Sequence, residues 1–147
     1  SHAGQVSFPG GRIEPRDESP LAAALREAEE EVGLAPHLVT PLGVLGLLET
    51  GTGYLIHPVV GVVTGAFTLS LDPGEVADAF EVPLAFLMDQ ANHELRSGVW
   101  KGQTRHYYAM PYGERFIWGA TAAILRELSD RLGAEGLRPW PAVEGTP

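Results

Sequence analysis

The acidic run at residues 26–31, Arg-Glu-Ala-Glu-Glu-Glu, most constrains how this chain can fold. Ser19 and Pro20 before it are a typical helix start, an N-cap followed by proline at the first helical position. Gly33 just after it is a typical helix stop. The sequence therefore predicts one helix over residues 20–32, with the acidic run in its last turns.

Three acids of this run share one helix face. Glu27, Glu30 and Glu31 are spaced i, i+3 and i+4 and fall within about 100° of one another. Like charges at this spacing destabilise a helix by about 0.2–0.5 kcal/mol per pair, and the helix dipole disfavours negative charge near the C-terminus. A divalent cation with oxygen ligands would resolve the conflict. The alternative is an ordinary solvated acidic face.

The other side of the same helix is expected to face the core. Ala23 falls on the acidic face, where its small side chain leaves room beside Glu27. Glu29 points away from the acidic cluster and is expected to be a solvated charge. The apolar stripe consists of Leu21, Ala24, Leu25, Ala28 and Val32.

A glycine pair precedes the helix. Residues 5–8 are predicted to form a short strand that runs into Pro9, Gly10 and Gly11 and then into an irregular loop. Adjacent glycines let the backbone approach a ligand closely and expose carbonyl oxygens as further ligands. A simple turn is the alternative reading of the pair.

Composition excludes several classes of protein. The 147 residues fit one domain, and the net charge of −9 disfavours nonspecific binding to nucleic acid. The chain has no cysteine, which excludes disulfides and thiolate metal sites. The apolar runs at residues 42–48 and 59–63 are too short to span a membrane, and no signal peptide is recognisable. The expected compartment is the cytoplasm.

The rest of the chain alternates strands and helices. A turn is expected at residues 49–53 and a loose, Gly/Pro-rich tail over residues 133–147. Mixed strands with two long helices predict the α/β class. The other predicted elements are strands over 38–48, 54–63, 105–110 and 115–118, a short helix over 83–89 and a long helix over 119–132.

Strand, glycine loop and acidic helix together resemble the Nudix hydrolases, whose signature is G-x5-E-x7-R-E-U-x-E-E-x-G-U, where U is a bulky apolar residue. The chain matches this signature from Glu18 to Leu34. Ala28 fills the first apolar position with a smaller side chain than usual. Six residues instead of five separate Gly11 from Glu18, and Asp17 restores that spacing but spoils the next one.

The longer loop and its flanks resemble one branch, the coenzyme A pyrophosphatases, which carry a motif of the form H-x-G-Q-V-S-F-P-G-G. His2 and residues 4–11 fit this motif, and segments at residues 53–61, 75–84 and 117–122 also resemble the branch. The resemblance implies a single Nudix domain over residues 1–132, an α/β/α sandwich with a mixed sheet. The branch has an N-terminal strand that has no counterpart here, so we expect further residues before Ser1.

The resemblance also implies a metal site for Mg²⁺ or Mn²⁺. Its ligands would be Glu27, Glu30 and Glu31, with a carbonyl oxygen of Gly10 or Gly11 completing the shell. Magnesium and manganese suit carboxylate and phosphate oxygens.

The catalytic roles implied by the resemblance are a proton acceptor and an arginine. Either Glu27 or a loop glutamate would take the proton of the attacking water. Glu75 is the loop candidate, and its alternative is a surface glutamate after the Asp-Pro-Gly turn; Glu49 is a weaker candidate. Arg26 would hold Glu18 and Glu30 in place.

The implied reaction is metal-dependent hydrolysis of coenzyme A or its derivatives to 3′,5′-ADP and 4′-phosphopantetheine. The alternatives are another nucleotide substrate, such as ADP-ribose, a dinucleotide or an oxidised nucleoside triphosphate, or a nucleotide-binding module without catalysis. The expected partner is a small nucleotide, with no nucleic acid or membrane, in a monomer or homodimer. His57 is expected in the core. The candidate substrate-binding residues are His2, Gln5, Phe8, Gly10, Arg12 and Tyr54.

Overall fold

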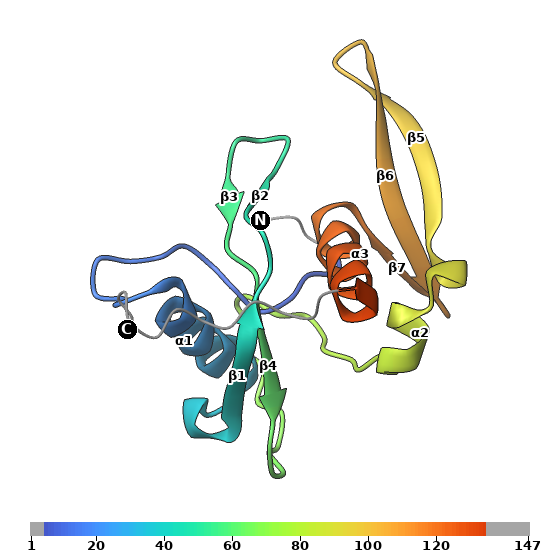
Figure 1. Cartoon of the computed structure of the whole chain (residues 1–147). Coiled ribbons are helices and arrows are strands. Elements are labelled where there is room, and N and C mark those ends of the chain that lie inside the picture. Colours follow the sequence, from blue (N-terminus) through green and yellow to red (C-terminus); the bar gives the residue numbers. More distant parts are fainter. Residues whose placement is uncertain (1–4, 135–147) are drawn as a thin grey trace. The chain divides into compact units, whose positions relative to one another are not determined.

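The computed structural model describes residues 5–134, which group into two compact units. Helices and strands both contribute (Figure 1), so the predicted α/β class is confirmed. We call the two units the acidic-helix unit, residues 9–47 and 55–80, and the hairpin unit, residues 5–8, 48–54 and 81–134.

The predicted acidic helix is confirmed as α1 (Pro20–Val32). The Ser19 side chain accepts a hydrogen bond from the backbone N–H of Ala22 at 3.1 Å, so Ser19 is the N-cap. Gly33 ends the helix with a φ of 79°, a left-handed conformation that glycine adopts without steric cost. The N-cap and the terminating glycine of α1 are therefore the residues predicted from the sequence.

The buried face of α1 differs in part from the predicted stripe. Ala23 and Ala28 are the buried residues of the helix, with 3% and 9% of their surface exposed. Ala23, predicted on the acidic face one turn before Glu27, is buried, so this end of the face is covered. The other members of the stripe are half-buried, namely Leu21, Ala24, Leu25 and Val32.

Two antiparallel strands, β1 (Val39–Val44) and β4 (Val59–Val63), accompany α1 in the acidic-helix unit. Their register is irregular between Pro41 and Gly43, which fits a bulge at a proline that has no N–H to donate. A Cβ at Gly61 would lie 2.7 Å from the Val39 side chain, so the close pairing needs glycine there.

The predicted strands over residues 38–48 and 54–63 are each broken in two. The first gives β1 and, in the hairpin unit, β2 (Leu48–Glu49), and the second gives β3 (Leu55–Ile56) and β4. His57 and Pro58 interrupt the second, because proline cannot donate to a strand ladder. His57 is exposed, so its predicted place in the core was wrong. A 3₁₀ turn (Pro36–Leu38) leads into β1.

Three antiparallel strands make the sheet of the hairpin unit. β5 (Glu94–Trp100) pairs with β6 (Gln103–Tyr112), which pairs with β7 (Arg115–Trp118). Lys101 and Gly102 join β5 to β6, and both have positive φ, 49° and 76°, as a tight two-residue hairpin turn requires. Figure 1 shows β5 and β6 as a long hairpin.

β6 and β7 confirm the strands predicted over residues 105–110 and 115–118, but β5 was missed. Every residue of β5 is exposed, and its sequence has no clean alternation of apolar and polar residues. The strand exists because it pairs along its whole length with β6, a long-range contact that local sequence does not reveal.

The core of the hairpin unit lies where α3 (Gly119–Ala134) packs against β6 and β7. The short helix α2 (Leu84–Met88) also packs on α3, and a 3₁₀ turn (Gln90–Asn92) follows it. Within residues 5–134 no helix has the length and apolar character to cross a membrane. The buried core residues are Met110, Ile117, Ala122 and Leu125.

Residues 5–8 do not form the predicted strand. The Val6 carbonyl instead accepts a hydrogen bond from Thr121 Oγ1 at 2.9 Å, and the Val6 side chain packs on the core of the hairpin unit. A helix side chain thus satisfies the acceptor that a neighbouring strand would have bound. The predicted tail lies, from residue 135 onward, outside the described residues.

A two-pronged ion pair ties the loop before α1 to the helix. Arg26 donates from Nε to Asp17 Oδ1 and from Nη2 to Asp17 Oδ2, both at 2.9 Å. The Asp17 side chain is only 4% exposed, and the hydrogen bonds from Arg26 lower the pKa of its carboxyl to about 2. Glu18, the predicted partner, is exposed. That prediction was wrong, because the longer loop brings the shorter acid, one position earlier, to the guanidinium.

Replacement of Asp17 should therefore destabilise the fold more than replacement of its neighbour. Asp17→Asn should lower the melting temperature at pH 7 by several degrees, because it removes the charge of the buried carboxylate that Arg26 binds at both oxygens. Glu18→Gln, the matched control, should change it by less than about 1 °C. Since the folded-state pKa is depressed, the contribution of Asp17 is present above about pH 4 and is lost as the pH falls toward 2. Calorimetry showing the larger loss at Glu18 would contradict this assignment.

Candidate active site

The glycine pair lies against the acidic face of α1. The backbone N–H of Gly10 donates to Glu31 Oε1 at 3.4 Å. A Cβ placed on Gly11 would lie 2.6 Å from Glu27 Cδ, so a side chain there would displace this carboxylate from its position. The pair is therefore more than a turn, because it covers the two carboxylates.

The C-terminal end of α1 binds a distant segment of the same unit. The last carbonyls of a helix have no partner within it. Here the Val32 carbonyl accepts from the Ser70 N–H at 3.0 Å, and the Glu31 carbonyl accepts from the Asp72 N–H at 3.1 Å. These bonds dock the segment that leads to Glu75 onto the end of the acidic helix.

The docked segment turns at the predicted Asp-Pro-Gly sequence. The Asp72 carbonyl accepts from the N–H groups of Glu75 and Val76, at 3.0 and 2.8 Å. Asp72 Oδ1 also accepts from the Gly74 N–H at 2.9 Å, the pattern by which aspartate stabilises turns. The turn sends the Glu75 side chain back toward α1.

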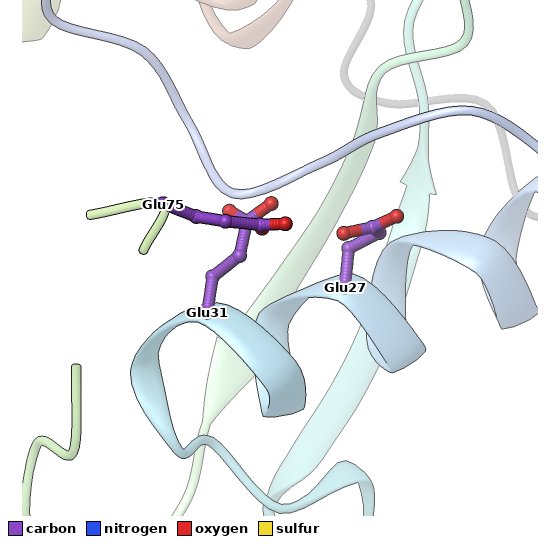
Figure 2. A group of neighbouring side chains, drawn as sticks. All are labelled: Glu27, Glu31 and Glu75. Atoms are coloured by element: carbon purple, nitrogen blue, oxygen red, sulfur yellow. The ribbon is translucent and has the colours of Figure 1, made fainter. Parts of the chain in front are cut away.

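Glu27, Glu31 and Glu75 consequently form one group, which we call the acidic triad. Each contributes a carboxylate oxygen, and these oxygens lie within 4.8 Å of one another. Figure 2 shows Glu27 and Glu31 one turn apart on α1, with Glu75 reaching over from its own segment. Two oxygens that bind the same hard dication lie at most about 4–5 Å apart, so the triad fits such an ion.

Electrostatics at the triad favour a positive ligand. Burial raises the pKa of the Glu31 carboxyl to about 7, and a hydrogen bond with Glu27 and the charges of Glu27 and Glu75 add to the shift. The Gly10 N–H opposes it by stabilising the carboxylate. Burial and the neighbouring negative charges both disfavour the ionised carboxylate of Glu31, and a bound cation would offset both effects.

Glu30 lies outside the triad. Its carboxylate is 3.3 Å from Arg26 Nη1 and 3.6 Å from Arg16 Nη2, and its side chain is 49% exposed. Helical spacing puts Glu30 on the same face, but the two arginines hold its carboxylate. Its part as a ligand stays a prediction.

Arg26 links the structural and acidic parts of the site. Besides Asp17 and Glu30, it donates from Nη1 to Glu27 Oε2 at 3.2 Å and from Nη2 to the Arg12 carbonyl at 3.1 Å. One guanidinium therefore fixes the loop and orients one carboxylate of the triad. Its predicted hold on Glu30 is present, whereas the hold on Glu18 is replaced by that on Asp17.

The predicted substrate-binding residues are divided between the two units. Gly10 and Arg12 lie in the acidic-helix unit beside the triad and Arg26, whereas Gln5, Phe8 and Tyr54 belong to the hairpin unit. Phe8 and Tyr54 are 46% and 57% exposed. His2 lies outside the described residues. The substrate contacts of these residues stay predictions.

Two aspartates in the surroundings of the triad were missed from sequence as functional candidates. Asp17 binds Arg26, and Asp72 builds the turn before Glu75. The extra residue between Gly11 and Glu18 was the signal for the first. The Asp-Pro-Gly turn was the signal for the second, although it does not say where the turn docks.

Comparison with known proteins agrees with this arrangement. Residues 1–102 match the NUDIX domain family. The chain is 42% identical over 132 residues to a protein of Photorhabdus laumondii, covering 90% of this chain and 71% of the relative. It is 40% identical over 134 residues to a protein of Escherichia coli K12, covering 91% and 70%. Both relatives are named uncharacterized Nudix hydrolase NudL. With this match and the acidic helix it explains, the chain belongs to the Nudix hydrolase family.

Proposed function

We propose that this Nudix hydrolase cleaves the pyrophosphate bond of coenzyme A or its derivatives, releasing 3′,5′-ADP and 4′-phosphopantetheine. The observation that carries the proposal is the contact between the branch motif and the triad. The motif that resembles coenzyme A pyrophosphatases ends at Gly10 and Gly11, which lie against Glu31 and Glu27. The part of the chain that suggests the substrate therefore adjoins the part that suggests the chemistry.

The triad supplies the oxygen donors that Mg²⁺ or Mn²⁺ prefers. Glu27, Glu31 and Glu75 would hold such an ion directly or through its water, and the carbonyl of Gly10 or Gly11 would complete the shell. A bound dication neutralises phosphoryl oxygens and makes its water more acidic. Glu30 would join the site if it left its arginines.

Glu75 is the proton acceptor we propose for the attacking water. Glu27 accepts a hydrogen bond from Arg26 that occupies one of its carboxylate oxygens, whereas within residues 5–134 Glu75 has no arginine partner. Glu75 also lies on a loop and is exposed, so water reaches it. The water oxygen bonds to phosphorus as the phosphoanhydride P–O bond breaks, and its proton passes to the Glu75 carboxylate.

A substrate panel tests the proposed specificity. Coenzyme A should be hydrolysed with a kcat/KM about tenfold or more above that of dephospho-coenzyme A, because a site that pairs the 3′-phosphate is left unpaired without it. ADP-ribose and a dinucleotide complete the panel, with products separated by chromatography in Mg²⁺ and in Mn²⁺. A preference for ADP-ribose or the dinucleotide would replace the coenzyme A assignment by the alternative substrate.

Two glutamates on α1 form a matched pair for testing the chemistry. Glu31→Gln should lower kcat/KM by about 100-fold or more, since it removes a charged oxygen from the triad. Glu29→Gln changes an exposed glutamate outside the triad and should leave the rate within about twofold of the parent. Equal rates for both variants would remove the triad from the mechanism.

The raised pKa of Glu31 predicts that the stability of the metal-free protein depends on pH. Between the ordinary value of 4.5 and about 7 the folded state holds more protons than the unfolded state, so stability falls as pH rises. With EDTA present, the melting temperature of Glu31→Gln should therefore rise relative to that of the parent between pH 5 and pH 8. The melting temperature of Glu29→Gln should not. Saturating Mn²⁺ should stabilise the parent more than Glu31→Gln at pH 8. Parallel pH profiles for the three proteins would contradict the raised pKa.

A further inference from the structure

We propose that Asp72 is a positioning residue that holds Glu75 at the acidic triad, an inference that rests on the proposed function. Asp72 does not belong to the triad and is half-buried in the turn before Glu75. It acts through the backbone of the loop and has no contact of its own with the reacting groups.

Asp72 ties the loop to the helix that carries the other two acids. Its N–H donates to the Glu31 carbonyl at 3.1 Å, while the Glu31 carboxylate belongs to the triad. The same residue of α1 thus anchors the loop by its main chain and faces Glu75 by its side chain. This short connection fixes where the Glu75 backbone starts.

Asp72 also shapes the turn that directs Glu75 toward the triad. Its carbonyl accepts the Glu75 N–H at 3.0 Å, and its carboxylate accepts the Gly74 N–H at 2.9 Å. Pro73 between them has a fixed φ and no N–H, so it adds no hydrogen bond that could replace these. The Asp72 side chain is therefore the element of the turn that a substitution can remove.

Apart from this turn, few contacts within the described part of the chain hold Glu75 at the triad. Its side chain is exposed, and its charge disfavours ionisation of Glu31 in the metal-free protein, so the other acids do not attract it. A loosened turn would let the carboxylate move away from the triad. Groups that orient a metal ligand or catalytic group typically change metal affinity or activity by about 10–100-fold when they are removed.

Three variants separate positioning from general stability. Asp72→Ala removes the acceptor for Gly74, and Asp72→Asn restores an oxygen acceptor without the charge. Asp89→Ala is the matched control, because Asp89 Oδ1 accepts from the N–H of Ala91, two residues on, at 3.0 Å in the hairpin unit. Circular dichroism confirms that each variant is folded before it is compared.

The measurements are Mn²⁺ affinity, by electron paramagnetic resonance titration without substrate, and kcat on coenzyme A. Asp72→Ala should lower both by about 10-fold or more, Asp72→Asn should recover to within about threefold, and Asp89→Ala should match the parent. Adding Asp72→Ala to Glu75→Gln should change Mn²⁺ affinity and kcat less than about twofold, because Glu75→Gln has already removed the carboxylate that Asp72 positions.

Additive effects in the double variant, or parental Mn²⁺ affinity in Asp72→Ala, would overturn the positioning role. If Asp72→Ala does not fold, Asp72→Asn with weakened Mn²⁺ binding would likewise overturn the hydrogen-bond account. The proposed function fails separately, through a parent protein that cleaves no coenzyme A. In that case the Mn²⁺ titrations still decide the role of Asp72.

Discussion

Repulsion among three carboxylates is the constraint around which the acidic-helix unit is organised. Glu27 and Glu31 sit near the C-terminal end of α1, where the helix dipole already disfavours negative charge, and Glu75 adds a third. The surrounding contacts each hold one of these acids in place. Gly10 donates to Glu31, Arg26 donates to Glu27, and the turn at Asp72 aims Glu75.

Local signals in the sequence predicted the helix and both of its caps, because capping depends on residues within a few positions of each end. The partner of Arg26 could not be predicted in the same way. A loop one residue longer decides whether Asp17 or Glu18 reaches the guanidinium, and spacing alone leaves both possible. The place of Glu75 beside α1 depends on hydrogen bonds between segments about forty residues apart in sequence.

Strand β5 was missed for the same kind of reason. Its residues are exposed and show no alternation, so the strand depends on its partner β6 and on the turn between them. For residues 5–8 the error is the reverse, because the local pattern predicts a strand and none forms. The Val6 carbonyl instead accepts a hydrogen bond from the side chain of Thr121. In both segments tertiary contacts override what the local pattern predicts.

Different segments of the chain supply different parts of the site. The helix gives the chemistry common to the family, and the loop that carries Gly10 and Gly11 gives the resemblance to a narrower branch. Both meet at the same carboxylates. The loop that resembles the branch therefore also helps to hold the acids of α1 in place.

The pairing of Arg26 with Asp17 bears on how residue roles are transferred between relatives. Roles are usually transferred by position in the sequence. Here the spacing to Arg26 points to Glu18, whereas the guanidinium of Arg26 binds the neighbouring Asp17. A chain with one inserted loop residue can keep its clamp by exchanging a longer acid for a shorter one at the preceding position. A comparison by position alone would then report this ion pair as lost, although the fold has kept it.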